Sequence, residues 1–197
     1  MKKLFLLMCF LPAFTLHAQQ VYKFGKGTTC VVKGTSTLHD WTATASEVSG
    51  MMEMDKSFAK KGLPKEGATI EKASFSVVVK SLDGGRGATM NNKINDAFNA
   101  DEHPNISFNL TKAEVTSVDK ANQKFVLNLT GKLSMAGKTK EVNFPMTGTV
   151  TNDGAYVFDG EKEIDMTTYG METPSAMFGQ IETGKDVNVI LHLVAKP

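Results

Sequence analysis

Alternation of apolar and polar side chains is the feature of this sequence that most limits its fold. From Phe125 to Met135 every second residue is apolar or glycine, and most residues between them are polar. The same period of two recurs at residues 74–79, 106–111, 142–146 and 187–193. Because side chains alternate across a strand, each segment predicts a strand with one apolar face. Parallel strands buried on both sides would read as continuous apolar runs, so we predict an antiparallel, all-β fold.

Turn residues separate these segments and set the number of strands. Residues 135–138 (Met-Ala-Gly-Lys) and 152–154 (Asn-Asp-Gly) each predict a hairpin between two strands. About eight or nine short strands result, which is typical of a closed barrel or of a β-sandwich. Periodicity alone does not separate these two architectures.

One segment departs from the strand rhythm. Residues 88–100 carry apolar side chains at i, i+4, i+7 and i+8, which predicts a short amphipathic helix. These side chains are Met90, Ile94, Ala97 and Phe98. Longer loops are expected where Pro and Gly are frequent, at residues 60–67 and 169–184.

The first residues have the order of a secretory signal. Two lysines precede an apolar run over residues 4–16, and the small Ala18 follows. This order predicts a signal peptide over residues 1–18, cut after Ala18, and one folded domain over residues 19–197. The apolar run is shorter than the roughly 20 residues that a transmembrane helix needs. We therefore expect an exported protein, periplasmic or secreted, without a transmembrane segment.

The charge of the predicted domain is close to neutral. Loss of the signal peptide reduces the 22 Lys and Arg residues to 20, against 21 Asp and Glu, for a net charge of −1. Nucleic-acid binding usually requires a concentrated basic face, and the chain contains only one arginine, Arg86. We therefore expect no nucleic-acid partner. Cys30 would be the only cysteine left, and we interpret it as a small apolar residue in a strand.

Residues that usually carry catalysis or bind metals do not have the required spacing. The histidines of the predicted domain, His39, His103 and His192, lie far apart, and no Gly-x-Ser-x-Gly motif is present. We expect no metal site, no cofactor and no catalytic residue. An enzyme that uses His39 and Asp40 is an alternative, and it requires both side chains to face one pocket.

Three segments resemble the YceI-like, polyisoprenoid-binding family. Residues 96–108 (DAFNADEHPNISF) are similar to its central signature, and residues 129–142 (LTGKLSMAGKTKEV) to its hairpin. Residues 165–171 together with 186–193 are similar to its C-terminal pattern. The resemblance implies a lipocalin-like, antiparallel, eight-stranded β-barrel with a long apolar cavity. It also implies an isoprenoid-type lipid as ligand, either a quinone or a polyprenyl chain, and no catalytic residues.

Two segments depart from the family pattern. The stretch 35–41 (TSTLHDW) stands where a His-Ser pair is commoner, and Asn91-Asn92 stands where His-Leu is frequent. Both lie where a ligand head group would be recognised, so the ligand is expected to differ. Trp41, the only tryptophan, is expected to plug one end of the barrel. The glycine-rich stretch 84–87 is interpreted as a surface turn rather than as a phosphate-binding loop.

One alternating set of side chains should face the interior, joined by the helix stripe and by residues flanking the Gly-rich loop. The predicted ligand-binding residues are Phe75, Val77, Val79, Met90, Ile94, Phe98, Phe108, Leu110, Phe125, Leu127, Leu129, Phe144, Met146, Met166, Met171, Met177 and Phe178. Alternation does not tell a lined cavity from a solid core. A stress or interaction protein of the cell envelope, with a filled barrel and no ligand, is therefore the main alternative. The sequence leaves the oligomeric state open, including a homodimer.

Overall fold

A computed structural model describes residues 20–54, 58, 62–176 and 178–197 of the chain. The predicted signal peptide, residues 1–18, lies outside these residues, and so does Met177. The signal peptide and export from the cytoplasm therefore stay predictions.

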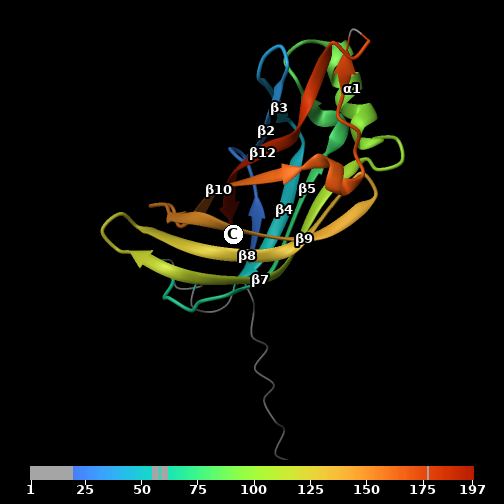
Figure 1. The fold of residues 1–197 in the computed structure, drawn as a ribbon. Coiled ribbons are helices and arrows are strands. Elements are labelled where there is room, and N and C mark those ends of the chain that lie inside the picture. The colour runs from blue at the N-terminus through green and yellow to red at the C-terminus, as the bar shows by residue number, and fades with distance from the viewer. Residues whose placement is uncertain (1–19, 55–57, 59–61, 177) are drawn as a thin grey trace, which may run out of the picture.

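Eight antiparallel strands close into a barrel (Figure 1), which confirms the all-β, lipocalin-like class and decides between barrel and sandwich. In the order of their hydrogen-bonded neighbours they are β1 (Gln20–Phe24), β4 (Val48–Met54), β5 (Ile70–Val78), β7 (Asn105–Asp119), β8 (Lys124–Met135), β9 (Lys138–Val150), β10 (Tyr156–Asp165) and β12 (Ile181–Lys196). β1 also pairs with β12, with Lys23 opposite Lys196 and Phe24 opposite Ala195, and this pairing closes the barrel.

Four further strands extend the barrel wall at one end. They are β2 (Thr29–Ser36), β3 (Trp41–Ala45), β6 (Leu82–Asp83) and β11 (Ser175–Ala176). β2 pairs with β12 and with β3, with Gly34 opposite Trp41. β1 pairs with β4, with Lys23 opposite Met51. This pairing is offset by only one residue from the pairing of β2 with β3. β1 and β2 therefore act as one long interrupted strand, and β3 and β4 act as a second.

Both predicted hairpins are confirmed. Ala136 and Gly137 connect β8 to β9 and have φ angles of 46° and 76°, the positive values that a two-residue type I′ turn requires. The second hairpin connects β9 to β10, and its Thr151 amide donates to the Ala155 carbonyl over 3.0 Å. Gly154 supplies the positive φ of that turn, at 80°.

The predicted helix is confirmed as α1 (Ala88–Phe98), which lies at the end of the barrel formed by β2 and β3 (Figure 1). Its apolar stripe turns inward, with Ile94 buried and Phe98 packed against the core. The helix ends where Asn99 adopts the left-handed conformation, with φ 49°. Two 3₁₀ helices complete the fold, η1 (Val79–Ser81) and η2 (Met166–Tyr169).

The loop predicted over residues 169–184 is shorter than expected. β12 already begins at Ile181, because Ile181 pairs with Ala176 of β11. Thr183 then pairs with Ser36 before a bulge separates it from the next pair, Val187 with Gly34. A bulge inserts residues into one strand and breaks the period of two, so the sequence pattern hid the first part of this strand.

Aromatic side chains close the barrel at the end opposite α1. We call this cluster the plug, and it consists of Tyr22, Phe58, Phe125, Tyr156 and Phe158. Most of its ring pairs meet edge to face, with centroids 5.5–6.2 Å apart. The Tyr156 hydroxyl donates to the carbonyl oxygens of Phe58 and Gly62 over 2.8 and 3.0 Å, which ties the β4–β5 connection to the barrel. Trp41 is not part of this cluster but lies on β3 near the other end of the barrel, so its expected role at that end stays a prediction.

Within the described residues, no helix is both long enough and apolar enough to cross a membrane.

Candidate ligand-binding site

An apolar cavity of about 150 Å³ lies inside the barrel, between the plug and α1. Inward-facing side chains from strands all around the barrel line it, and α1 and η2 contribute to its far end. Eleven of the seventeen predicted ligand-binding residues line this cavity: Phe75, Val77, Ile94, Phe98, Phe108, Leu127, Leu129, Phe144, Met146, Met166 and Met171. Their role in binding stays a prediction, but the structure brings them to one place.

Three predicted residues are buried or half-buried away from the cavity. Phe125 belongs to the plug and is 1% exposed. Val79 is fully buried in η1, where the chain has left the strand alternation. Leu110 packs against the core around the plug, next to a register shift between Leu110 and Lys112 that ends the alternation of β7. A bulge and a 3₁₀ turn thus displace residues that a strict period of two would place in the cavity.

Two further predicted residues, Met90 and Phe178, do not line the cavity. Met90 lines a second hollow beyond α1, and Phe178 is fully exposed, with a positive φ of 56°. Met177 falls outside the described residues. The Gly-rich loop therefore contributes Met171 to the cavity, but Phe178 faces solvent.

Several lining residues were missed because the sequence does not show which strands lie side by side in the barrel. Cys30 and Val32 of β2, Ala43 of β3, and Val187 and Val189 of β12 all line the cavity. The alternation of Val187 and Val189 was visible in the sequence, but nothing there placed this strand beside β2. Lys162 was also missed, because a lysine is not expected inside a barrel.

Cys30 is free and 4% exposed, as expected for a small apolar residue in a strand. Burial raises the pKa of its thiol to about 11. Since the thiolate is the nucleophile, the thiol of the folded protein is unreactive at neutral pH.

A second hollow of about 290 Å³ lies where α1, the β2–β3 turn and the segment before β12 meet. We call it the vestibule. Trp41, Ile94 and Pro174 line both the vestibule and the cavity, so the two are adjacent. Among its described lining residues, those that can carry charge are His39, Arg86 and Lys93, and none is acidic. The vestibule is thus the polar neighbour of the apolar cavity.

The hydrogen bonds of His39 with Arg86 and Asp40 show which ring nitrogen of the imidazole carries the proton. Arg86 Nη1 lies 2.8 Å from His39 Nε2, and His39 Nδ1 lies 2.8 Å from the Asp40 carbonyl oxygen. Arg86 can only donate, so Nε2 must accept, and Nδ1 carries the proton that it donates to Asp40. These contacts assign the neutral Nδ1–H tautomer. The Asp40 carboxylate is exposed and does not line the vestibule, so the pocket that the enzyme alternative requires is not formed.

Asn91 holds the glycine-rich turn in front of α1. Its Oδ1 accepts from the Gly84 amide over 2.9 Å, and its Nδ2 donates to Asp83 Oδ1 over 3.2 Å. The Gly85 amide donates to the same Asp83 oxygen over 2.9 Å. Asn91, which departs from the family pattern, therefore positions the turn that carries Arg86.

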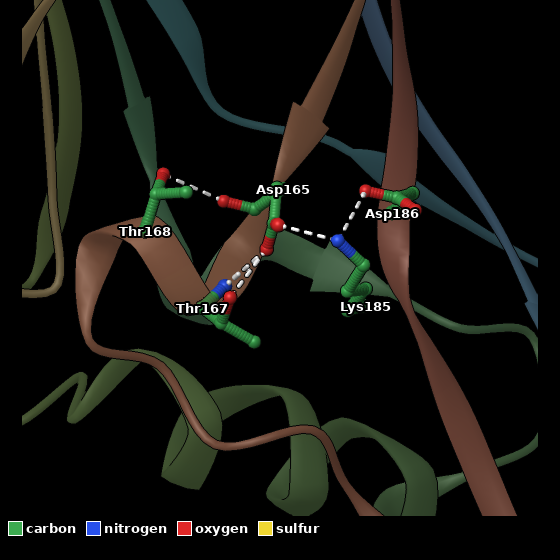
Figure 2. A network of polar contacts seen from close by, with 5 residues as sticks. All are labelled: Asp165, Thr167, Thr168, Lys185 and Asp186. Atoms are coloured by element: carbon green, nitrogen blue, oxygen red, sulfur yellow. Dashed lines mark hydrogen bonds and ion pairs between the residues drawn. The ribbon is translucent and has the colours of Figure 1, made fainter.

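A polar network around Asp165 attaches η2 to β12 (Figure 2). The Asp165 carboxylate accepts from the Thr167 amide and hydroxyl over 2.9 and 2.6 Å, which caps η2. It also forms an ion pair of 2.8 Å with Lys185, whose ammonium lies 3.9 Å from Asp186. Met166 of η2 lines the cavity, so this network positions part of its wall.

Replacing Asp165 by Asn should reduce stability in a pH-dependent way. The hydrogen bond from Lys185, followed by that from Thr167, lowers the pKa of Asp165 to about 2. A carboxyl group whose pKa is lowered by folding stabilises the protein above its unfolded pKa of about 3.9 and loses that contribution as pH falls through the folded pKa. We therefore expect the difference in unfolding free energy between wild type and Asp165→Asn to be constant above about pH 5 and to shrink from there towards pH 2.

Urea unfolding at pH 7, 5, 3 and 2 measures this difference. Asp186→Asn is the control, because Asp186 is farther from the same ammonium and makes no cap. A difference for Asp165→Asn that does not change between pH 5 and pH 2 would contradict the assignment.

The fold and the site define a closed β-barrel with an apolar interior cavity and a polar vestibule. The YceI-like domain model matches residues 22–195. The chain therefore belongs to the YceI-like family, as the sequence motifs indicated. A comparison with curated protein sequences gave no match.

Solved structures of similar fold extend over most of the chain. Burkholderia cenocepacia BcnA aligns with a TM-score of 0.65 and 22% identity, over 86% of this chain and 96% of that one. A polyisoprenoid binding domain from Saccharophagus degradans, implicated in plant cell wall breakdown, aligns with a TM-score of 0.65 and 10% identity, over 91% and 99%. The Campylobacter jejuni YCEI protein aligns with a TM-score of 0.57 and 18% identity, over 79% and 84%. At these identities the likeness concerns the fold.

Proposed function

We propose that this protein is an exported binding protein that holds one isoprenoid-type lipid, a quinone or a polyprenyl chain, inside the barrel and does not catalyse a reaction. The observation that carries the proposal is the cavity inside the barrel, whose described lining is apolar apart from Ser74, Lys162 and the indole nitrogen of Trp41. An apolar cavity with a few polar groups at its edge is the usual form of a small-molecule site. The polyisoprenoid binding domain with the same fold supports this ligand class.

Burial of the ligand's hydrocarbon chain supplies the affinity for the protein. Each CH₂ group moved from water into an apolar interior contributes roughly 0.8 kcal/mol. An engineered apolar cavity of about 150 Å³ binds benzene, so a cavity of this size takes only a short part of a polyprenyl chain. We infer that the interior widens on binding, by movement of flexible side chains such as Met146, Met166 and Met171.

The two alternatives receive less support. A filled barrel predicts a packed interior, whereas this interior contains a cavity of about 150 Å³. An enzyme at His39 and Asp40 predicts that both side chains face one pocket, whereas only His39 lines the vestibule. Export rests on the signal peptide predicted over residues 1–18.

Native mass spectrometry of the protein purified from the exported fraction tests the proposal directly. We expect a discrete bound mass that organic extraction removes and that lipid analysis identifies as an isoprenoid. The extracted protein should take up a short-chain quinone or a polyprenol when either is added back. A protein that is ligand-free as isolated and stays so after both incubations would favour the filled-barrel interaction protein.

A further inference from the structure

Lys162 faces the interior of the barrel although its sequence neighbours face solvent. Along β10, Phe158, Lys162 and Ile164 line the cavity, whereas Glu161 and Glu163 between them are exposed. Among the described lining residues, Lys162 is the one that carries a charge. The alternation of β10 thus turns the aliphatic stem of Lys162 toward the apolar cavity.

The Lys162 ammonium has no partner in the part of the chain that the structure describes. No hydrogen bond or ion pair joins it to another described residue, and its side chain is half-buried. The vestibule cations differ in this respect, since Lys93 donates to the Ser175 carbonyl and Arg86 to His39. An anion that binds there would give this ammonium a charged hydrogen-bond partner.

At the level of Lys162, β10 pairs with β12 but not with β9. The pairing of β9 with β10 ends at Gly160 opposite Met146, and two residues further along, Phe144 and Lys162 would face each other but do not pair. Pro145 of β9, next to the last pair, has no amide hydrogen to donate. Beyond this point β9 pairs with β8 and β10 with β12. The lysine stem can lie along the apolar lining while its ammonium reaches the unpaired edge of the wall.

We propose that Lys162 binds the acidic head group, a carboxylate or a phosphate, of an isoprenoid ligand whose apolar tail fills the cavity. This proposal rests on the proposed function and narrows its ligand from a neutral quinone or polyprenol to an acidic isoprenoid. A hydrogen bond between an ammonium and a carboxylate or phosphate is shorter and stronger than one between neutral groups. Apolar surroundings strengthen it further, because little water competes for the two charges.

Three ligands with the same chain test the proposal: farnesol, farnesoic acid and farnesyl phosphate. Trp41 lines the cavity and is the only tryptophan, so its fluorescence reports binding of each. We expect wild type to bind at least one of the two acids about tenfold or more tightly than farnesol. The acid that binds more tightly distinguishes a carboxylate from a phosphate ligand. Lys162→Met should lose this preference, so that it binds farnesol and the two acids with about equal affinity.

Lys33→Met is the matched control, because Lys33 is exposed on β2 beside Val32, which lines the cavity. Lys33→Met should retain the preference for the acid. Lys162→Gln provides a second, polar variant and should behave as Lys162→Met does. Circular dichroism confirms that each variant is folded.

Three results would overturn the role of Lys162. The first is that wild type binds both acids and farnesol with equal affinity. The second is that Lys162→Met still prefers an acid to farnesol. The third is that Lys33→Met loses the preference as well. The second result would place the head group at the vestibule cations instead. If none of the three ligands binds, the proposed function itself is contradicted. This outcome is therefore distinct from the three results that contradict only the role of Lys162.

Discussion

Phe125→Ala is expected to lower the free energy of unfolding by about 3–5 kcal/mol, the largest effect on stability that we predict. Phe125 is 1% exposed and contacts the rings of Phe58, Tyr156 and Phe158 edge to face, with centroids 5.8–6.2 Å apart. Its ring also lies directly over Gly148, where a Cβ atom would come within 2.1 Å of it. Removing the ring loses its transfer free energy and leaves a cavity that the rigid barrel wall cannot fill.

Denaturant unfolding of wild type and variant measures this loss, with the slope of the transition checked for two-state behaviour. Phe178→Ala is the matched control, since it removes the same ring from a fully exposed position. We expect the control to change stability by less than about 0.5 kcal/mol. A loss at Phe125 as small as that at Phe178 would show that the plug does not stabilise the barrel.

Ala73→Phe is expected to weaken binding of an isoprenoid ligand at least tenfold, about 1.4 kcal/mol or more. Ala73 of β5 lines the cavity, is half-buried and lies opposite Met52 of β4. A benzyl side chain there would occupy a cavity of about 150 Å³, a volume that one benzene molecule can fill. The added ring occupies existing space, so the cost in stability should stay at or below about 1–3 kcal/mol.

Titration with farnesol or a short-chain quinone, followed by Trp41 fluorescence, measures the affinity. Ser76→Phe is the control, because Ser76 lies on the same strand, pairs with Ser49 and Ser107, and does not line the cavity. The control should bind as wild type does. If Ala73→Phe remains folded and binds with unchanged affinity, the ligand does not occupy this cavity.

The elements that sequence alone predicted well are those governed by local geometry. The period of two in residues 125–135 and the turns at residues 135–138 and 152–154 determine β8, β9 and β10, because strand alternation and turn conformation depend on near neighbours. The stripe from Met90 to Phe98 determines α1 for the same reason. The family motifs then indicated which closed fold these elements form.

The site was predicted in part. Alternation shows which face of a strand a residue lies on, but not its position along the barrel axis. Leu127 and Phe125 share one face of β8, yet Leu127 lines the cavity and Phe125 belongs to the plug. Leu110 was misplaced by a bulge, and the start of β12 at Ile181 was hidden by another. Bulges arise from pairing with a distant strand, so the residues around them carry little signal of their own.

The sequence by itself determined the strand rhythm, the helix, the turns and the family of this protein, since each depends on residues close together in the chain. Only the tertiary structure decided which apolar residues pack as a plug and which surround a cavity. It also decided that Arg86 meets His39 and that Lys162 faces inward at an unpaired edge. These outcomes depend on barrel closure, which joins β1 to β12 and sets the level of every side chain along the axis.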